Sequence, residues 1–108
     1  MVGELAPQLS GRKDMEIREI EIYSDAPNYV IVRTPGRNYP GCVIQGDSLA
    51  ILLDRASEVC SLARSSGNQD LIEEAEDLEQ ALKERLDDYE VVLKAHGFDL
   101  PYARRPRT

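Results

Sequence analysis

Polar and apolar residues alternate in the first third of the chain, a pattern that predicts β-strands. In the stretch MEIREIEIY, Ile20 and Ile22 lie on one side of an extended chain, and Ile17 is one position out of step. A single displaced residue is typical of a β-bulge, so we expect a bulged first strand. The run Tyr29 to Val32 consists of residues that suit a pleated surface and predicts a second strand.

Turn-forming residues separate the predicted strands. Asp25, Pro27 and Asn28 lie between the first two strands, and two Pro-Gly pairs follow the second. The short apolar run Cys42 to Ile44 then predicts a third strand. We therefore expect a small three-stranded antiparallel sheet.

After Gly46 the apolar period changes to that of a helix. Asp47 or Ser48 is the expected N-cap, because either side chain can accept a hydrogen bond from the first turn. The apolar positions recur at about 100° per residue, which predicts an amphipathic helix that packs on the sheet. They are Leu49, Leu52, Leu53, Ala56, Val59, Cys60 and Ala63.

A second helix is expected after the turn Ser65 to Asn68, in which Gly67 suits the left-handed position at a helix end. Asp70 and Glu73 have the spacing of a capping box. The helix should end near His96, before Gly97. Its apolar stripe contains Leu71, Ala75, Leu78, Leu82, Leu86, Tyr89 and Leu93.

This second helix is long for so small a protein. At a rise of about 1.5 Å per residue it extends roughly 40 Å. Folded back as an αα-hairpin, it should cover Ile51 and Leu62, which lie off the stripe of the first helix. The part of Leu71 to Leu93 that remains is available for a homodimer.

Together these elements predict an α+β fold, in which a small three-stranded antiparallel sheet is packed by one helix. A long acidic helix follows and forms the αα-hairpin. The 108 residues, 42% of them apolar, suit one small core. We assign residues 15–100 to one domain, and residues 1–14 and 101–108 to flexible tails.

Charge narrows the range of partners. The segment Glu73 to Glu90 holds nine acidic and two basic residues, so it alone carries the chain's net charge of −7. Nucleic acids and anionic membranes are bound through Lys and Arg, so neither is an expected partner. A basic protein is. The chain has neither a run of about 20 apolar residues nor a secretory signal pattern, which predicts a cytoplasmic location.

The sequence does not predict catalysis. His96 is the only histidine, and no CxxC pair, Gly-x-Ser-x-Gly turn or phosphate-binding glycine loop is present. Cys42 and Cys60 are expected to be reduced and packed in the core. We predict no catalytic residue, metal site or cofactor, and an enzyme that binds Mg²⁺ or Ca²⁺ through carboxylates is the alternative of another class.

The predicted partner contacts come from two places. One is the exposed acidic surface of the second helix, with the candidates Glu73, Glu74, Glu76, Asp77, Glu79, Asp87 and Asp88. The other is the irregular segment before the third strand, with the candidates Arg37, Asn38 and Tyr39.

The run YPGCVIQGDSL, Tyr39 to Leu49, resembles HicB-type antitoxins. In that family a hairpin leads to a Pro-Gly-Cys turn, a short strand and a Gln-Gly-Asp-(Ser/Thr)-Leu helix start. The strand Tyr29 to Arg33 precedes the run in the same order, and GFDLP, Gly97 to Pro101, is similar to the family's Gly-x-x-(Ile/Leu)-Pro ending. The resemblance implies a small sheet with a helix on one face, and a function in sequestering a basic RNA-cleaving toxin.

The chain departs from that family in two respects. Its acidic helix, Asp70 to His96, is an addition or extension, and no DNA-binding element is expected after Pro101. The chain also resembles small uncharacterised bacterial proteins that share the strand, PGR and QGDS pattern, which implies the fold and no activity. We therefore predict a non-catalytic, antitoxin- or immunity-like domain that masks a basic partner. The alternative is a structural homodimerisation module.

Overall fold

A computed structural model describes residues 15–26 and 29–103 of the chain. The chain divides into two compact units, residues 1–43 and 44–108, and each is described by itself. The prediction of a single domain over residues 15–100 stays a prediction.

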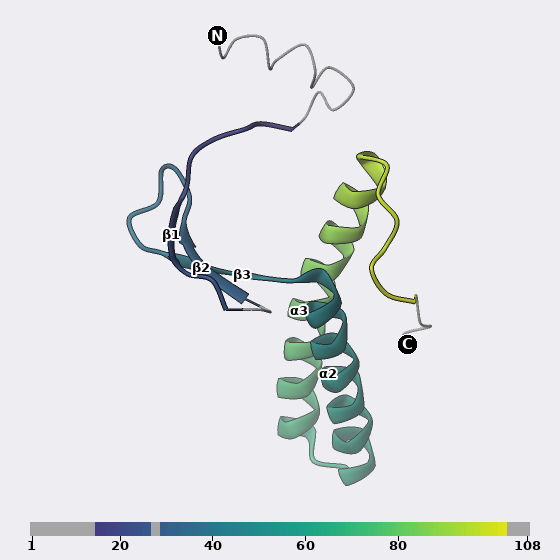
Figure 1. The fold of residues 1–108 in the computed structure, drawn as a ribbon. Helices are drawn as coiled ribbons and strands as arrows, with labels where there is room; N and C mark the ends of the chain where they lie inside the picture. Colours follow the sequence, from purple (N-terminus) through teal and green to yellow (C-terminus); the bar gives the residue numbers. More distant parts are fainter. Residues whose placement is uncertain (1–14, 27–28, 104–108) are drawn as a thin grey trace, which may run out of the picture. The chain divides into compact units, whose positions relative to one another are not determined.

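The described elements confirm the predicted α+β fold class, because a three-stranded antiparallel sheet is followed by two helices (Figure 1). The elements are β1 (Glu21–Ser24), β2 (Tyr29–Arg33), β3 (Gly41–Ile44), α2 (Gly46–Ser66) and α3 (Gln69–Ala95).

The sheet has the order β1-β2-β3. In the antiparallel pair of β1 and β2, Ile22 lies opposite Val32 and Ser24 lies opposite Ile31. Tyr23 is therefore the extra residue of a bulge. Val32 is the buried apolar residue described in this unit, at 4% exposure.

The first strand is shorter than predicted. It begins at Glu21, so Ile17 lies outside it and the bulge expected there is wrong. The bulge falls at Tyr23 instead, one residue before the end of β1, where Tyr23 has no opposite residue on β2. Pro27 and Asn28 of the predicted turn lie outside the described residues.

Helix α2 begins earlier than predicted, at Gly46. Its N-cap is Gln45, whose side chain makes no capping hydrogen bond, so the predicted cap at Asp47 or Ser48 is wrong. Both of those residues lie inside the first turn, where the backbone N–H of Ser48 donates to Asp47 Oδ1 at 2.8 Å. The first residue of the helix is glycine, which has no Cβ, and a Cβ at position 46 would overlap the ring of Tyr89.

In the turn between the helices, Gly67 has the predicted role, whereas the N-cap of α3 is not the predicted residue. Gly67 has a φ of 71°, as expected for a left-handed helix end. Asn68 caps α3, because its side-chain oxygen accepts a hydrogen bond from the N–H of Leu71 at 3.2 Å. The predicted capping box of Asp70 and Glu73 is therefore wrong. The helix ends at Ala95, within one residue of its predicted end.

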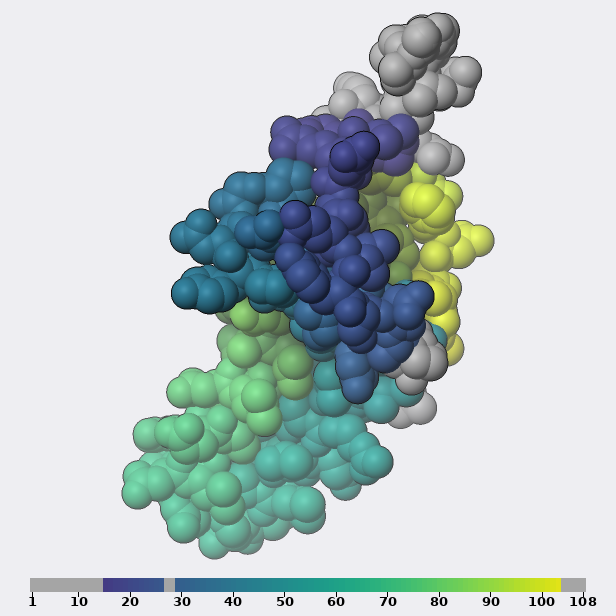
Figure 2. Space-filling view, turned by 60° about the vertical axis from the view of Figure 1, so that its left-hand side comes forward, coloured from purple at the N-terminus to yellow at the C-terminus, as the bar shows by residue number. Residues whose placement is uncertain are grey.

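The two helices pack as an antiparallel hairpin and contact each other, and the lower part of Figure 2 shows α2 in teal beside α3 in green. Leu53 and Leu86 are 1% exposed, and burying such a side chain contributes about 1.5–3 kcal/mol. We call the residues of this contact the seam. One cluster contains Ala50, Leu53 and Leu86 with Leu49, Leu82, Tyr89 and Tyr102, and the other contains Cys60, Ala63 and Ala75 with Ile72.

The seam is narrower than the predicted apolar stripes. Leu52 and Val59 of α2, and Leu71 and Leu78 of α3, belong to those stripes but are 43% to 53% exposed. Ala50, Ala63 and Ala75 occupy the seam, and one partner helix covers only a narrow stripe of positions, so the flanking apolar residues stay exposed.

Two further predictions concern what covers the helices. Ile51 and Leu62 are 60% and 64% exposed, so α3 does not cover them as expected. The packing of the sheet on the first helix stays a prediction.

Candidate partner-binding surface

One line of acidic side chains runs along α3 on the side opposite the seam. Because Ala75, Leu82 and Leu86 face α2, residues about half a turn away face solvent. Five acidic residues occupy that position at helical spacing, and all are exposed. This acidic ridge consists of Asp70, Glu73, Asp77, Glu84 and Asp88.

The ridge carries no ion pair among the described residues. Two of its acids accept hydrogen bonds from neutral amides: Gln69 donates to Glu73 and Gln80 donates to Glu84, each at 3.1 Å. Neighbours three or four residues apart on a helix are about 5–6 Å apart at Cβ. The ridge is therefore closely spaced from Asp70 to Asp77 and again from Glu84 to Asp88, and about 10 Å of helix separates these two groups of negative charges.

The structure separates the predicted acidic contacts into two groups. Glu73, Asp77 and Asp88 belong to the ridge. Glu76 is instead paired with Arg64 across the hairpin at 3.4 Å, and Asp87 with Lys83 at 2.8 Å. Exposed pairs of this kind contribute about 0–1 kcal/mol, but they reduce the charge offered to a partner.

The remaining two predicted acidic residues lie elsewhere on α3. Glu74 is exposed beside the seam, one position before Ala75. Glu79 is half-buried near Cys60, where burial of the thiol raises its pKa and the Glu79 carboxylate raises it further. Cys60 is thus held as a neutral thiol inside the hairpin.

The predicted loop contacts are exposed and belong to the other unit. Pro35 and Gly36 form a turn in which the N–H of Arg37 donates to the carbonyl of Thr34 at 3.2 Å, and Gly36 has a φ of 85°. Tyr39 is 82% exposed, and Arg37 and Asn38 are also exposed.

A shallow cleft of about 300 Å³ lies beside this turn. Arg37 and Tyr39 line it, together with Cys42, whereas Asn38 does not. Cys42 is exposed, so its predicted place in the core is wrong. Cys42 lies in β3, and all four residues of this short strand are exposed, which explains why the thiol is not in a core.

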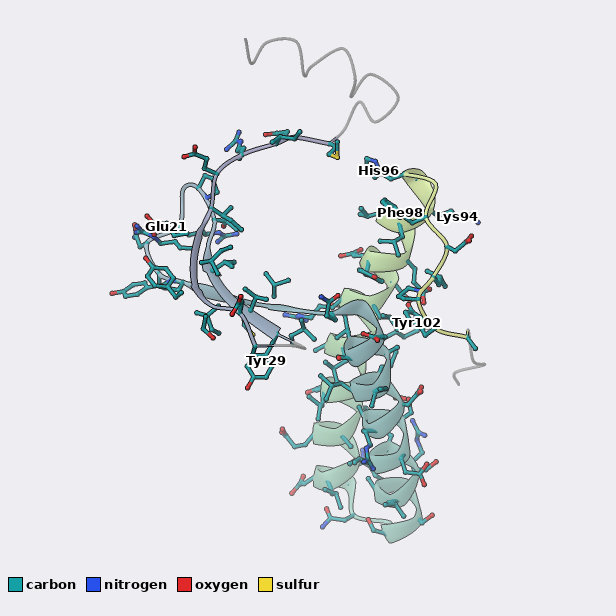
Figure 3. All side chains as sticks on the ribbon, viewed as in Figure 1. Glu21, Tyr29, Lys94, His96, Phe98 and Tyr102 are labelled. Carbon is teal, nitrogen blue, oxygen red and sulfur yellow. The ribbon has the colours of Figure 1, made fainter. Side chains whose placement is uncertain are left out.

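The C-terminal segment makes a contact that the sequence did not predict. It turns back beside α3 after His96, as the labelled residues of Figure 3 show. The hydroxyl of Tyr102 donates to Glu90 at 2.5 Å, and Glu90 is 7% exposed. Tyr102 belongs to the predicted tail, and a lone aromatic residue among Pro and Arg gave no signal that it would pack.

A wider cleft of about 640 Å³ lies between this segment and α3. Val91, Phe98 and Leu100 supply apolar walls, and Lys83 and Lys94 supply basic ones. His96 is the C-cap residue of α3, at the position predicted for it.

The described residues contain neither a metal-binding cluster nor a membrane-spanning helix. Within residues 15–26 and 29–103, no three His, Cys, Asp or Glu side chains are grouped so that they could hold a metal ion. In the same ranges, neither helix combines the length and apolar character needed to cross a membrane.

The fold and this surface define a small α+β protein whose αα-hairpin carries an acidic outer surface. The chain belongs to a family of unknown function, DUF6959, whose sequence model matches residues 15–102. Neither the curated proteins nor the solved structures compared with the chain gave a match. Membership of an uncharacterised family is thus established, and the resemblance to HicB-type antitoxins stays a prediction.

Proposed function

We propose that this protein is a non-catalytic binding domain that masks a basic protein partner, in the manner of an antitoxin or immunity protein. The observation that carries the proposal is the acidic ridge, five exposed carboxylates in a row without a cation among the described residues.

Electrostatics explains why such a ridge suits a basic partner. A surface with one sign of charge speeds the encounter with a partner of opposite sign, and its attraction weakens over a Debye length of about 8 Å at physiological salt. Because the ridge acids form no ion pair within residues 15–26 and 29–103, a partner's Lys or Arg side chains need not displace a cation described there.

The turn at Arg37 to Tyr39 is the proposed second contact. Tyr39 is a large aromatic side chain at 82% exposure, and aromatic residues dominate the binding energy of many interfaces. The QGDS and PGC resemblance to HicB-type antitoxins supports the same class of function.

The test compares partner capture by three purified chains in lysate of the source organism. The ridge variant carries Glu73→Gln, Asp77→Asn, Glu84→Gln and Asp88→Asn. The matched control carries Glu16→Gln, Glu19→Gln, Asp25→Asn and Asp99→Asn, which are exposed acids outside the ridge. Bound proteins are quantified by mass spectrometry at about 50 mM and 300 mM salt.

We expect the wild type and the control to enrich the same protein of high isoelectric point at low salt. The ridge variant should lose it at least tenfold, as should the wild type at high salt. Equal capture by the ridge variant would reject the proposal, and so would enrichment of acidic proteins alone.

A further inference from the structure

One side of the helical hairpin is apolar although it lies outside the seam. Its residues are 43% to 64% exposed. We call it the apolar side; it consists of Leu52, Val59, Leu71, Leu78 and Val92, and it continues around α2 to Ile51 and Leu62.

Helical geometry places these residues on the same side of the hairpin. An approximate two-fold axis, normal to the plane that contains both helices, relates two antiparallel helices. If a residue on each helix is rotated from the seam in the same direction about its own helix axis, the two residues therefore lie on the same side of the hairpin. Arg64 and Glu76 each follow a buried alanine by one residue, and their ion pair at 3.4 Å shows that they share a side.

The residues of the apolar side are rotated from the seam in the direction opposite to that of Arg64 and Glu76. Leu52 precedes the buried Leu53 by one position, and Val59 precedes the buried Cys60. On α3, Leu78 lies three residues after Ala75, which turns it the same way. The hairpin therefore has a polar side, with Arg64 and Glu76, and an apolar side facing away from it.

The apolar side is large enough to join two chains. A half-exposed aliphatic side chain leaves about 100 Å² in contact with water, so the five residues of the apolar side expose on the order of 500 Å², and Ile51 and Leu62 on the outer face of α2 extend this to about 700 Å². The largest apolar patch of a monomer is about 300–600 Å². A standard interface takes about 800 Å² from each partner.

Charge favours a second copy as the occupant. The acidic ridge points away from the seam and about a quarter turn from the apolar side, so two copies can meet without opposing their ridges. The exposed charges on the apolar side are Arg55, Glu74 and Arg85, a mixed set that can pair between copies. A strongly basic partner would find few acidic side chains to bind on the apolar side.

We propose that the apolar side joins two copies of this chain, so that their two hairpins form a four-helix bundle. Two hairpins that cover each other's open side are a standard route to such a bundle. The acidic ridges remain at its outside, available to another partner. This inference does not depend on the proposed function, because it concerns a different surface.

The test is the molar mass in solution of the full chain, measured by light scattering and sedimentation from about 1 to 100 µM, a range that brackets a micromolar Kd. We expect the mass of two 12.1 kDa chains at the upper concentrations. Leu78→Lys should give 12.1 kDa. Leu82 would be a poor choice for this test, because it packs in the seam.

A matched control keeps the result interpretable. Val91→Lys makes the same charge change at a residue that is 67% exposed and points away from the apolar side, and it should remain dimeric. Val59→Lys provides a second disruption if Leu78→Lys unfolds, as judged by circular dichroism. A wild type that stays monomeric overturns the proposal, whether another segment of the chain covers this side or not. Dimers that survive both substitutions on the apolar side also overturn it.

Discussion

Gly46 shows how one absent side chain positions a whole helix. The QGDS run looks like a sequence motif that invites a functional explanation, yet its glycine has a packing role. The ring of Tyr89 on α3 occupies the space that a Cβ at position 46 would need. The first turn of α2 can therefore lie directly against α3.

Substitution Gly46→Ala should destabilise the protein, although alanine ordinarily stabilises a helix interior by about 1 kcal/mol over glycine. Here Tyr89 must move, and overpacking of this kind costs about 1–3 kcal/mol. Urea unfolding followed by circular dichroism measures the change. Gly41→Ala is the control, because nothing lies within 4 Å of a Cβ there, and it should leave the midpoint nearly unchanged. An increase in stability with Gly46→Ala would contradict the packing role.

At the scale of elements, the hairpin depends on how its two helices begin. Helix α2 starts without a side-chain cap, whereas α3 starts with Asn68 bonded to the N–H of Leu71. The short turn also limits which residues of α3 face α2, because only Gly67 and Asn68 lie between the two helices. By fixing where α3 begins, the cap helps to set the rotation of α3 about its own axis, and with it the direction in which the ridge faces solvent.

Replacing Asn68 with Ala should lower the free energy of unfolding by about 1 kcal/mol, the usual loss for an N-cap. Asp70→Ala is the informative comparison, because Asp70 was expected to cap the helix from its spacing with Glu73. Asp70 lies inside the first turn and Asn68 caps the helix, so replacing Asp70 should change the free energy of unfolding far less than Asn68→Ala. Chemical denaturation of both variants distinguishes them, and equal losses would reject Asn68 as the cap.

The elements were largely predictable from the sequence, and their caps and contacts were not. Alternation and the helical period identified three strands and two helices, and Gly67 and Gly97 marked both helix ends. Capping depends on local geometry that several polar residues could satisfy, so Asn68 was missed. The seam is set by how closely two alanine-rich surfaces approach, which periodicity alone does not report. The helix was recognised as acidic, but the ridge acids Asp70 and Glu84 were not among the predicted contacts, and which acids are ion-paired required the fold.

At the scale of the whole molecule, charge and apolar surface are distributed over different sides of one hairpin. The net charge of −7 is concentrated on α3, where ridge carboxylates repel one another. The seam must hold α3 in place against that repulsion. Stability should therefore depend on ionic strength.

Raising NaCl from about 10 mM to 500 mM should raise the melting temperature by a few degrees, because salt screens repulsion between exposed charges. The ridge variant with four neutralised acids should begin with a higher melting temperature and respond less to salt. Differential scanning fluorimetry of the two chains suffices. A wild type that loses stability with added salt would mean that attractive pairs, such as Lys83 with Asp87, outweigh the repulsion.

The bond between Tyr102 and Glu90 also has a consequence for the order of folding during synthesis. The seam cluster of Cys60, Ala63 and Ala75 unites residues on either side of one short turn, so it can close as soon as the start of α3 leaves the ribosome. The cluster at the other end of the seam joins residues far apart in the sequence, from Leu49 to Tyr102. The nascent hairpin therefore closes from its turn, and its other cluster forms only after Tyr102 has been made and has left the ribosome.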